Sequence, residues 1–207
     1  MEKPYHKLIT KPVVVIDVDG VILDFSTAFA DWFNETYPNY EIDGKRWTCP
    51  ANPHDWQFEH PDNEWITRKI MKFLYLGTVF SLLNKNIPEQ MMRLQEKYYI
   101  HLATNYPAKM AAVRILTLNK YGIPYDNITF TDDHKGEIVK RLDPVMVIED
   151  SPKNIRSIVE AGYKVRVPSY WNYVMPLREE KTIMKKVKFY SNFGDVVDEL
   201  LRIAINI

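Results

Sequence analysis

The sequence predicts an α/β protein: a parallel sheet between two layers of helices, with a mostly helical insert after the first strand. Short apolar runs that are typical of buried strands alternate along the 207 residues with stretches of helical periodicity, which is the pattern of repeated βαβ units. The alternation is interrupted once, over residues 24–97. Polar residues, several of them acidic, follow the end of one predicted strand after another.

The first predicted strand covers residues 13–19, where four apolar residues run directly into Asp17 and Asp19. A run without polar alternation is typical of a strand that is buried on both faces in a parallel sheet. Side chains two apart on a strand point the same way, so the two aspartates share one site if the strand continues that far. Gly20 allows a sharp turn there. An ordinary strand that ends in an Asp-Gly turn explains this segment alone equally well.

The interrupted region, residues 24–97, is expected to form an inserted helical domain, and residues 1–23 and 98–207 are expected to form the core. Ser26 is a suitable N-cap for the first helix of the insert. Residues 38–64 are rich in Pro, Asn, Asp and Trp and show no steady period, so an irregular segment is expected there, followed by two further helices.

The second half of the chain returns to regular alternation. Strands are predicted at residues 98–104, 128–130, 145–148 and 164–167, and helices at residues 107–121, 135–142, 153–161 and 193–204. Pro107 suits the first turn of a helix, and Gly122 suits its end. These elements complete a three-layered sheet.

Composition limits the classes of partner and compartment. The formal net charge is zero, so no global field attracts a nucleic-acid polymer or a membrane surface. The single cysteine, Cys49, has no partner within the chain for a disulfide, which fits a reducing compartment. No apolar leader and no membrane-spanning run is present, so a cytoplasmic protein is expected. No pattern encodes an oligomeric state, and a homodimer stays open.

Polar side chains gather where the predicted strands end. In open α/β sheets, ligands bind beyond the carboxyl ends of the strands. The residues expected at this edge are Asp17, Asp19, Thr104, Asn105, Lys135, Glu149 and Asp150. Chance placement of turn residues explains one or two such endings but not all four.

Four short motifs in this order resemble those of the haloacid dehalogenase superfamily of phosphotransferases: residues 17–21, Thr104, Lys135 and residues 149–150. The large insert directly after the first motif resembles the helical cap that many members carry there. Residues 148–154, followed by Trp-Asn-Tyr at 171–173, look most like the cytosolic type of 5′(3′)-deoxyribonucleotidase. The resemblance implies a doubly wound, Rossmann-like parallel sheet of the haloacid dehalogenase type, with the cap inserted after the first strand.

The resemblance also implies roles for individual residues. Asp17 would attack phosphorus and form an aspartyl-phosphate, and Asp19 would protonate the leaving oxygen and later take a proton from water. Thr104 would donate a hydrogen bond to a phosphoryl oxygen, with help from Asn105. Lys135 would neutralise charge on the transferred group. The substrate would be a small-molecule phosphate monoester, most similar to a nucleotide.

The acids also predict a metal site. A phosphate monoester is close to dianionic at neutral pH, and clustered carboxylates would repel it unless a divalent cation reverses the sign. Oxygen-only ligands suit Mg²⁺. The expected metal residues are Asp17, Asp19 and Asp150, with Glu149 reaching the ion through water.

The insert is rich in aromatic residues, most of which are expected to build its own core. Those in the irregular segment are harder to place in a core. Phe25, Arg46 and Trp47 are expected to contact substrate, and Trp56 and Phe58 are further candidates for stacking on a base.

Alternatives remain open at this point. Thr104 alone would be explained as a cap of the helix at Pro107, and Lys140 and Lys153 are alternatives to Lys135 at the site. A sugar-phosphate phosphatase or mutase of the same superfamily fits the motifs as well. A non-catalytic nucleotide-binding protein is the third reading, against which the intact acids argue.

Overall fold

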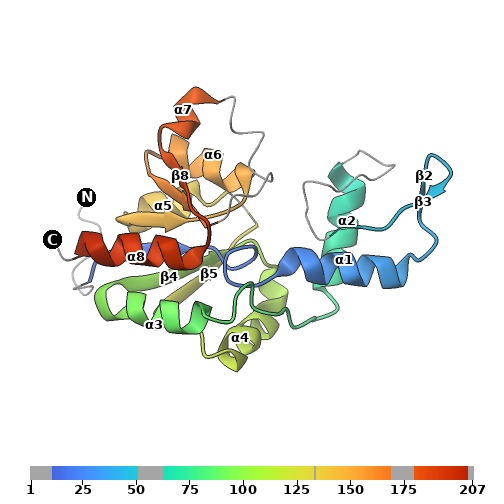
Figure 1. Cartoon of the computed structure of the whole chain (residues 1–207), viewed down its shortest axis with the longest axis horizontal. Helices are drawn as coiled ribbons and strands as arrows, with labels where there is room; N and C mark the ends of the chain where they lie inside the picture. The colour runs from blue at the N-terminus through green and yellow to red at the C-terminus, as the bar shows by residue number, and fades with distance from the viewer. Residues whose placement is uncertain (1–10, 51–62, 133, 169–179, 205–207) are drawn as a thin grey trace.

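The computed structural model describes residues 11–50, 63–132, 134–168 and 180–204, and it contains the predicted parallel sheet (Figure 1). Six strands pair in the order β5–β4–β1–β6–β7–β8, all in parallel. Their bounds are β1 Val13–Ile16, β4 Tyr99–Thr104, β5 Asn127–Phe130, β6 Met146–Ile148, β7 Val165–Val167 and β8 Val187–Phe189. The apolar run of the first strand therefore lies at the centre, between β4 and β6, and the predicted fold class is confirmed.

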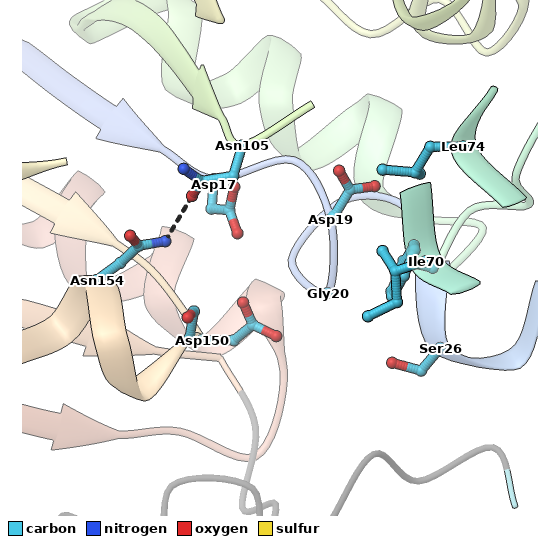
Figure 2. Close-up of a pocket in the computed structure, with 11 residues that line it drawn as sticks. Asp17, Asp19, Gly20, Ser26, Ile70, Leu74, Asn105, Asp150 and Asn154 are labelled. Atoms are coloured by element: carbon cyan, nitrogen blue, oxygen red, sulfur yellow. Dashed lines mark hydrogen bonds between the residues drawn. The ribbon is translucent and has the colours of Figure 1, made fainter. Parts of the chain in front are cut away.

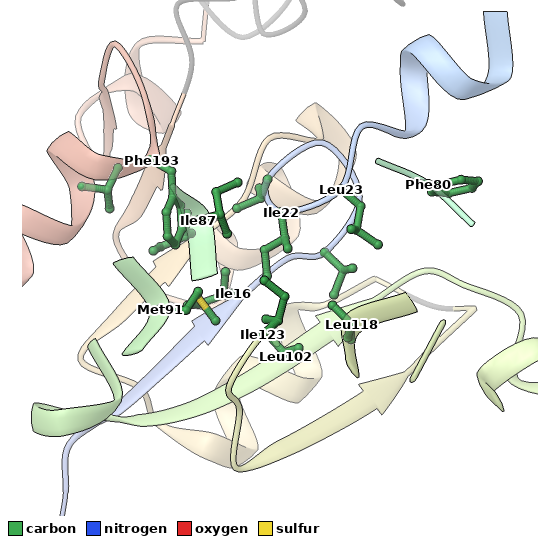
Figure 3. Close-up of a cluster of buried hydrophobic side chains, with 14 of the residues drawn as sticks. Ile16, Ile22, Leu23, Phe80, Ile87, Met91, Leu102, Leu118, Ile123 and Phe193 are labelled. Carbon is green, nitrogen blue, oxygen red and sulfur yellow. The ribbon is translucent and has the colours of Figure 1, made fainter. Parts of the chain in front are cut away.

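Helices cover both faces of the sheet. They are α3 Ile87–Lys97, α4 Ala111–Lys120, α5 Gly136–Leu142, α6 Pro152–Glu160, α7 Lys181–Met184 and α8 Phe193–Ala204. Alternate residues of β1 belong to two separate clusters of buried side chains. Ile16 packs with Met91 of α3 and Phe193 of α8 (Figure 3), whereas Val15 packs with Ile155 of α6. None of the described helices is long and apolar enough to cross a membrane.

Most elements lie within a few residues of their predicted bounds, but two regions differ. Residues 41–46 form a small hairpin of β2 Glu41–Ile42 and β3 Lys45–Arg46 inside the segment that was expected to be irregular. Helix α7 and strand β8 were not predicted. Elements of two to four residues carry too little periodicity to be distinguished from a loop in the sequence.

The insert contains α1 Phe25–Thr36, the β2–β3 hairpin and α2 Asn63–Leu74, which extend from one end of the sheet (Figure 1). Helix α1 is capped by Asp24 rather than by Ser26, because the Asp24 carboxylate accepts a hydrogen bond of 3.1 Å from the Thr27 N–H. An aspartate in this position satisfies a free N–H group of the first helical turn. The Ser26 side chain is therefore not needed as the cap.

Two chain segments connect the insert to the sheet, and they run side by side. Leu23 and Leu82 form an antiparallel bridge, and the Asp24 N–H donates to the Ser81 carbonyl at 2.9 Å. Helix α3 lies within the expected insert range but packs against α8 over the sheet. We therefore propose that the inserted unit ends before α3.

Cys49 is buried in the insert, where the Asn34 side chain bonds to both its backbone N–H and its carbonyl. Burial raises the pKa of the thiol to about 12, so the thiolate is scarce at neutral pH. The environment is that of a structural residue and not of a nucleophile.

Candidate active site

Three carboxylates meet at the carboxyl edge of the sheet. One oxygen each of Asp17, Glu149 and Asp150 lies within 4.8 Å of the others. Asp17 directly follows β1, and the two other acids directly follow β6. Because Ile16 and Ile148 pair in register on these neighbouring parallel strands, the acids leave the sheet at the same edge. The sequence prediction that distant acids converge is borne out for these three side chains.

Lys135 joins the cluster from the segment before α5. Its Nζ lies 2.5 Å from Asp17 Oδ1 and 2.8 Å from Glu149 Oε2, and its side chain is 1% exposed. Burial alone would lower the pKa of the ammonium, but the charges of the two acids outweigh it and raise the pKa above its usual value. Lys140, one of the alternatives, instead pairs with Glu137 on the surface.

The acid cluster holds more negative than positive charge, since three carboxylates surround one ammonium. Burial, together with the charge of Asp17, raises the pKa of both Glu149 and Asp150. Buried carboxylates in this arrangement are stabilised by a cation, and an oxygen-only donor set suits Mg²⁺. The residues present therefore fit a divalent metal ion.

Glu149 has both oxygens engaged within the protein. Oε2 accepts from Lys135, and Oε1 accepts from the Ser151 N–H at 2.9 Å, just before α6 begins. The side chain is fully buried. Glu149 therefore fixes Lys135 and the loop after β6, and its contact with a metal through water stays a prediction.

Gly20 brings the turn after β1 close to Asp150. Its φ is +83°, and a Cβ at this position would lie 2.0 Å from Asp150 Oδ2. Only glycine combines this backbone conformation with this close approach. The glycine in the first motif is thus required by the position of the carboxylate at 150.

The structure does not bring the Asp19 carboxylate into the acid cluster, so a metal contact of this side chain stays a prediction. Strand β1 ends at Ile16, and the next residues coil, with the Ile22 N–H donating to the Val18 carbonyl at 2.9 Å. The two-residue alternation of a strand no longer applies there. The Asp19 carboxylate instead pairs with Arg114 at 2.8 Å and points toward Leu74 of the insert (Figure 2). Burial raises the pKa of Asp19, while the charge of Arg114 acts in the opposite direction.

Thr104 and Asn105 follow β4 and flank the aspartates. The Thr104 hydroxyl donates to Asp19 Oδ2 at 3.3 Å, and no side chain caps the 3₁₀ turn after Pro107. Asn105 is fixed from both ends: its Nδ2 donates to the Thr131 carbonyl at 3.1 Å, and its Oδ1 accepts from Asn154 at 2.8 Å (Figure 2). The structure therefore places Thr104 at the site and not at a helix cap.

A cavity of about 220 Å³ opens between this edge of the sheet and the insert. It is lined by Asp17, Asp19, Gly20, Phe25, Ser26, Ile70, Leu74, Asn105, Asp150, Ser151 and Asn154 (Figure 2). The sheet contributes the acids and amides, and the insert contributes mainly apolar side chains. Within the described part of the chain, no lysine or arginine lines the cavity.

The sequence matches no protein-family model and no curated protein. Solved structures match over nearly the full length. A haloacid dehalogenase (HAD) family hydrolase from Deinococcus radiodurans, with bound phosphate and sodium, is 13% identical with a TM-score of 0.58, over 90% of this chain and 93% of that one. A predicted phosphoglycolate phosphatase from Haemophilus somnus is 15% identical with a TM-score of 0.59, over 93% and 99%. The chain has the haloacid dehalogenase-like fold. A candidate β-phosphoglucomutase from Thermotoga maritima, 18% identical with a TM-score of 0.55 over 92% and 99%, shares it.

Within this haloacid dehalogenase-like fold, two expected substrate contacts lie away from the cavity. Arg46 is exposed on β3, and the Trp47 ring packs 5.9 Å from Phe33 and 5.8 Å from Tyr40. The hairpin that carries them lies at the end of α1 far from the sheet (Figure 1). Trp47 thus belongs to the aromatic core of the insert, while Phe25 does line the cavity. Trp56, Phe58 and residues 171–173 lie outside the described residues.

Arg114 is the site residue that sequence reasoning missed. It lies on α4, is 2% exposed and pairs with Asp19. A signal was available, because Arg114 stands three and four residues before Thr117 and Leu118, on the buried face of its helix. A charged residue on an apolar helix face requires a buried partner.

Proposed function

We propose that this protein is a Mg²⁺-dependent phosphomonoesterase that hydrolyses a small phosphate monoester through an aspartyl-phosphate on Asp17. The observation that supports this most directly is the buried acid cluster with Lys135, of which Asp17 and Asp150 line the cavity. The haloacid dehalogenase-like fold of the chain is consistent with such chemistry, and a matching hydrolase holds phosphate.

In the first half of the reaction, an oxygen of Asp17 attacks phosphorus while the bond to the leaving oxygen breaks, and Asp19 donates a proton to that oxygen. Lys135, 2.5 Å from Asp17, stabilises negative charge on the transferred group. In the second half, water attacks the phosphorus and gives a proton to Asp19, while the bond from phosphorus to the Asp17 oxygen breaks, which releases inorganic phosphate and restores the Asp17 carboxylate. Asp17 and Asp150, with Glu149 behind them, would hold a magnesium ion whose charge offsets repulsion between the carboxylates and the phosphate.

The apolar wall of the cavity favours a nucleoside monophosphate, and the sequence resemblance favours a deoxyribonucleotide. Phe25, Ile70 and Leu74 offer contact to a base, and no basic side chain among the described lining residues is available for a second anionic group. A sugar phosphate is the second candidate, because a candidate β-phosphoglucomutase shares the fold.

Phosphate release from a substrate panel tests the proposal. Purified protein with Mg²⁺ is given deoxyribonucleoside and ribonucleoside 5′- and 3′-monophosphates, hexose phosphates and triose phosphates, with EDTA as the control. We expect metal-dependent release, with the highest kcat/KM for deoxyribonucleoside monophosphates. Faster release from sugar phosphates would favour the second candidate. Nucleotide binding without release from any substrate would contradict an enzymatic function.

A further inference from the structure

Arg114 has no role in the mechanism given above, although it pairs with Asp19, which exchanges the proton in that mechanism. We propose that Arg114 is a positioning residue that holds the Asp19 carboxylate where it exchanges a proton with the leaving group. This inference rests on the proposed function, since it concerns the proton step of the same reaction.

Arg114 itself is held firmly. Its guanidinium carbon lies 4.1 Å from the ring centroid of Tyr106 and 4.6 Å from that of Phe80. Tyr106 follows β4, and Phe80 precedes α3 on the segment that returns from the insert. Aromatic rings stabilise a guanidinium by cation–π attraction and restrict its orientation. The side chain therefore presents Nη2 to Asp19 in one direction.

Asp19 is oriented by two hydrogen bonds to Oδ2 and by the ion pair of Oδ1 with Arg114. Arg114 Nη2 lies 2.8 Å from Oδ1 and 3.1 Å from Oδ2, and the Thr104 hydroxyl donates to Oδ2. Hydrogen bonds between ions are stronger than neutral ones, and contact with two oxygens restricts rotation of the carboxylate. Without the arginine, Thr104 alone would hold a carboxylate at the end of a turn.

The direction in which Asp19 is held suits proton transfer better than metal binding. Gly20 lies between it and Asp150, and its carboxylate faces Leu74 and Ile70 of the insert (Figure 2). In an in-line displacement at a phosphoryl group bound to Asp17, the leaving oxygen lies opposite the attacking oxygen. The alcohol part of the substrate then occupies the apolar side of the cavity. As the bond from phosphorus to oxygen breaks, the Asp19 proton passes to that oxygen.

A purely structural role is the competing explanation, in which the pair only anchors α4 to the turn after β1. Loss of stability does not separate the two explanations, because removal of either charge leaves the other buried and unpaired. Dependence on the leaving group does separate them. A p-nitrophenolate leaves without a proton, whereas the alkoxide of benzyl phosphate needs one.

The experiment compares Arg114→Met and Arg114→Lys with wild type on p-nitrophenyl phosphate and benzyl phosphate in Mg²⁺. We expect Arg114→Met to lower kcat for benzyl phosphate about 100-fold and kcat for p-nitrophenyl phosphate less than about threefold, with KM little changed. Arg114→Lys should recover part of the loss and serves in place of Arg114→Met if that variant does not fold. Arg166→Met, which breaks the pair with Glu199, is the matched control, and it should change kcat by the same factor for both substrates.

Equal losses on both substrates in the Arg114 variants would overturn the inference. A crystal structure of Arg114→Met gives a second readout that is independent of turnover. We expect the Asp19 carboxylate to be rotated from its present direction, and an unchanged carboxylate would overturn the inference as well. If wild type releases phosphate neither from these compounds nor from any member of the substrate panel, the proposed function fails, and the position of the Asp19 carboxylate in the variant still decides whether Arg114 positions it.

Discussion

Two ionic clusters in this protein have opposite charge balance. In the acid cluster, three carboxylates, those of Asp17, Glu149 and Asp150, lie together, and the ammonium of Lys135 pairs with the first two. In the second cluster, the single carboxylate of Glu199 on α8 accepts from three donors, which are Arg166 of β7, Lys188 of β8 and Tyr190. The first lies at the carboxyl edge of the sheet, and the second fastens a helix to two strands.

The pKa values of the carboxylates differ between the two clusters in the direction that the charge balance predicts. Burial would raise the pKa of Glu199, but hydrogen bonds from Lys188, Tyr190 and Arg166 lower it to about 2. For Glu149 and Asp150, burial and neighbouring negative charge both act upward, and the pKa is raised. A carboxylate whose partners all come from the chain stabilises the fold. Carboxylates that outnumber their positive partner are the arrangement expected of a site for an external cation, as proposed above.

The largest effect on turnover is expected from replacement of the proposed nucleophile, Asp17. We expect Asp17→Asn to lower kcat by about 10³-fold or more, because an amide oxygen does not form a phosphoryl-enzyme. The fold should survive, since the substitution removes one of three crowded carboxylates. Phosphate release and thermal unfolding measure the two effects, with Glu199→Gln as the variant that should keep wild-type turnover. Wild-type activity in purified Asp17→Asn protein would show that the mechanism is wrong.

Replacement of Lys135 removes the ammonium that pairs with Asp17 and Glu149 in the acid cluster. We expect Lys135→Met to lower kcat about 10²-fold or more and to destabilise the metal-free protein by about 3–5 kcal/mol, because buried carboxylates lose their ammonium. Urea unfolding in EDTA measures the second effect. Lys140→Met removes an exposed lysine that pairs with Glu137, and it should change stability by less than about 1 kcal/mol. Similar results for the two variants would contradict the importance of the buried pair.

A methyl group at position 20 should disturb the acid cluster without a change of charge. In Gly20→Ala the new Cβ would lie 2.0 Å from Asp150 Oδ2, so that carboxylate must move. We expect Mg²⁺ affinity, read from activation of turnover, to fall by about 10- to 100-fold. Gly122→Ala is a matched control, because Gly122 also has a positive φ of 62° but no atom within 4 Å of such a Cβ. An unchanged Mg²⁺ requirement in Gly20→Ala would indicate that Asp150 is not a ligand.

The acid cluster was predictable from sequence to a greater degree than its surroundings. Asp17 and Asp150 converge because each ends a recognisable apolar strand, and parallel strands meet at one edge. The direction in which the Asp19 carboxylate points was not predictable, because it depends on the coil after Ile16 and on the buried Arg114 of α4. The packing of Trp47 against Phe33 and Tyr40 was not predictable for a similar reason: whether an aromatic residue packs in a core or faces a cavity depends on non-local neighbours.

The pH dependence of stability should have opposite sign in the two clusters. The folded pKa values of Glu149 and Asp150 lie above their ordinary values, so the metal-free protein loses stability as pH rises from about 4 through the raised pKa of Glu149, about 7. Mg²⁺ binds the ionised forms, so its stabilisation should grow with pH and reach about 3 kcal/mol at 100 times Kd. Thermal unfolding between about pH 5 and pH 8, with and without Mg²⁺, measures this. The same Mg²⁺ effect in Asp150→Asn would exclude the acid cluster as the site.

Glu199 should give the smallest effect, confined to stability. Its folded pKa, about 2, lies below the ordinary value of 4.5, so its contribution is present above pH 4.5 and is lost as the pH falls toward 2. We expect Glu199→Gln to lower the free energy of unfolding by about 1–2 kcal/mol at neutral pH, because a partly exposed network is screened by solvent. The difference from wild type should shrink in acid, whereas kcat and Mg²⁺ dependence stay unchanged. A loss of turnover in this variant would mean that the second cluster is coupled to the site, and the contrast between the two clusters would not hold.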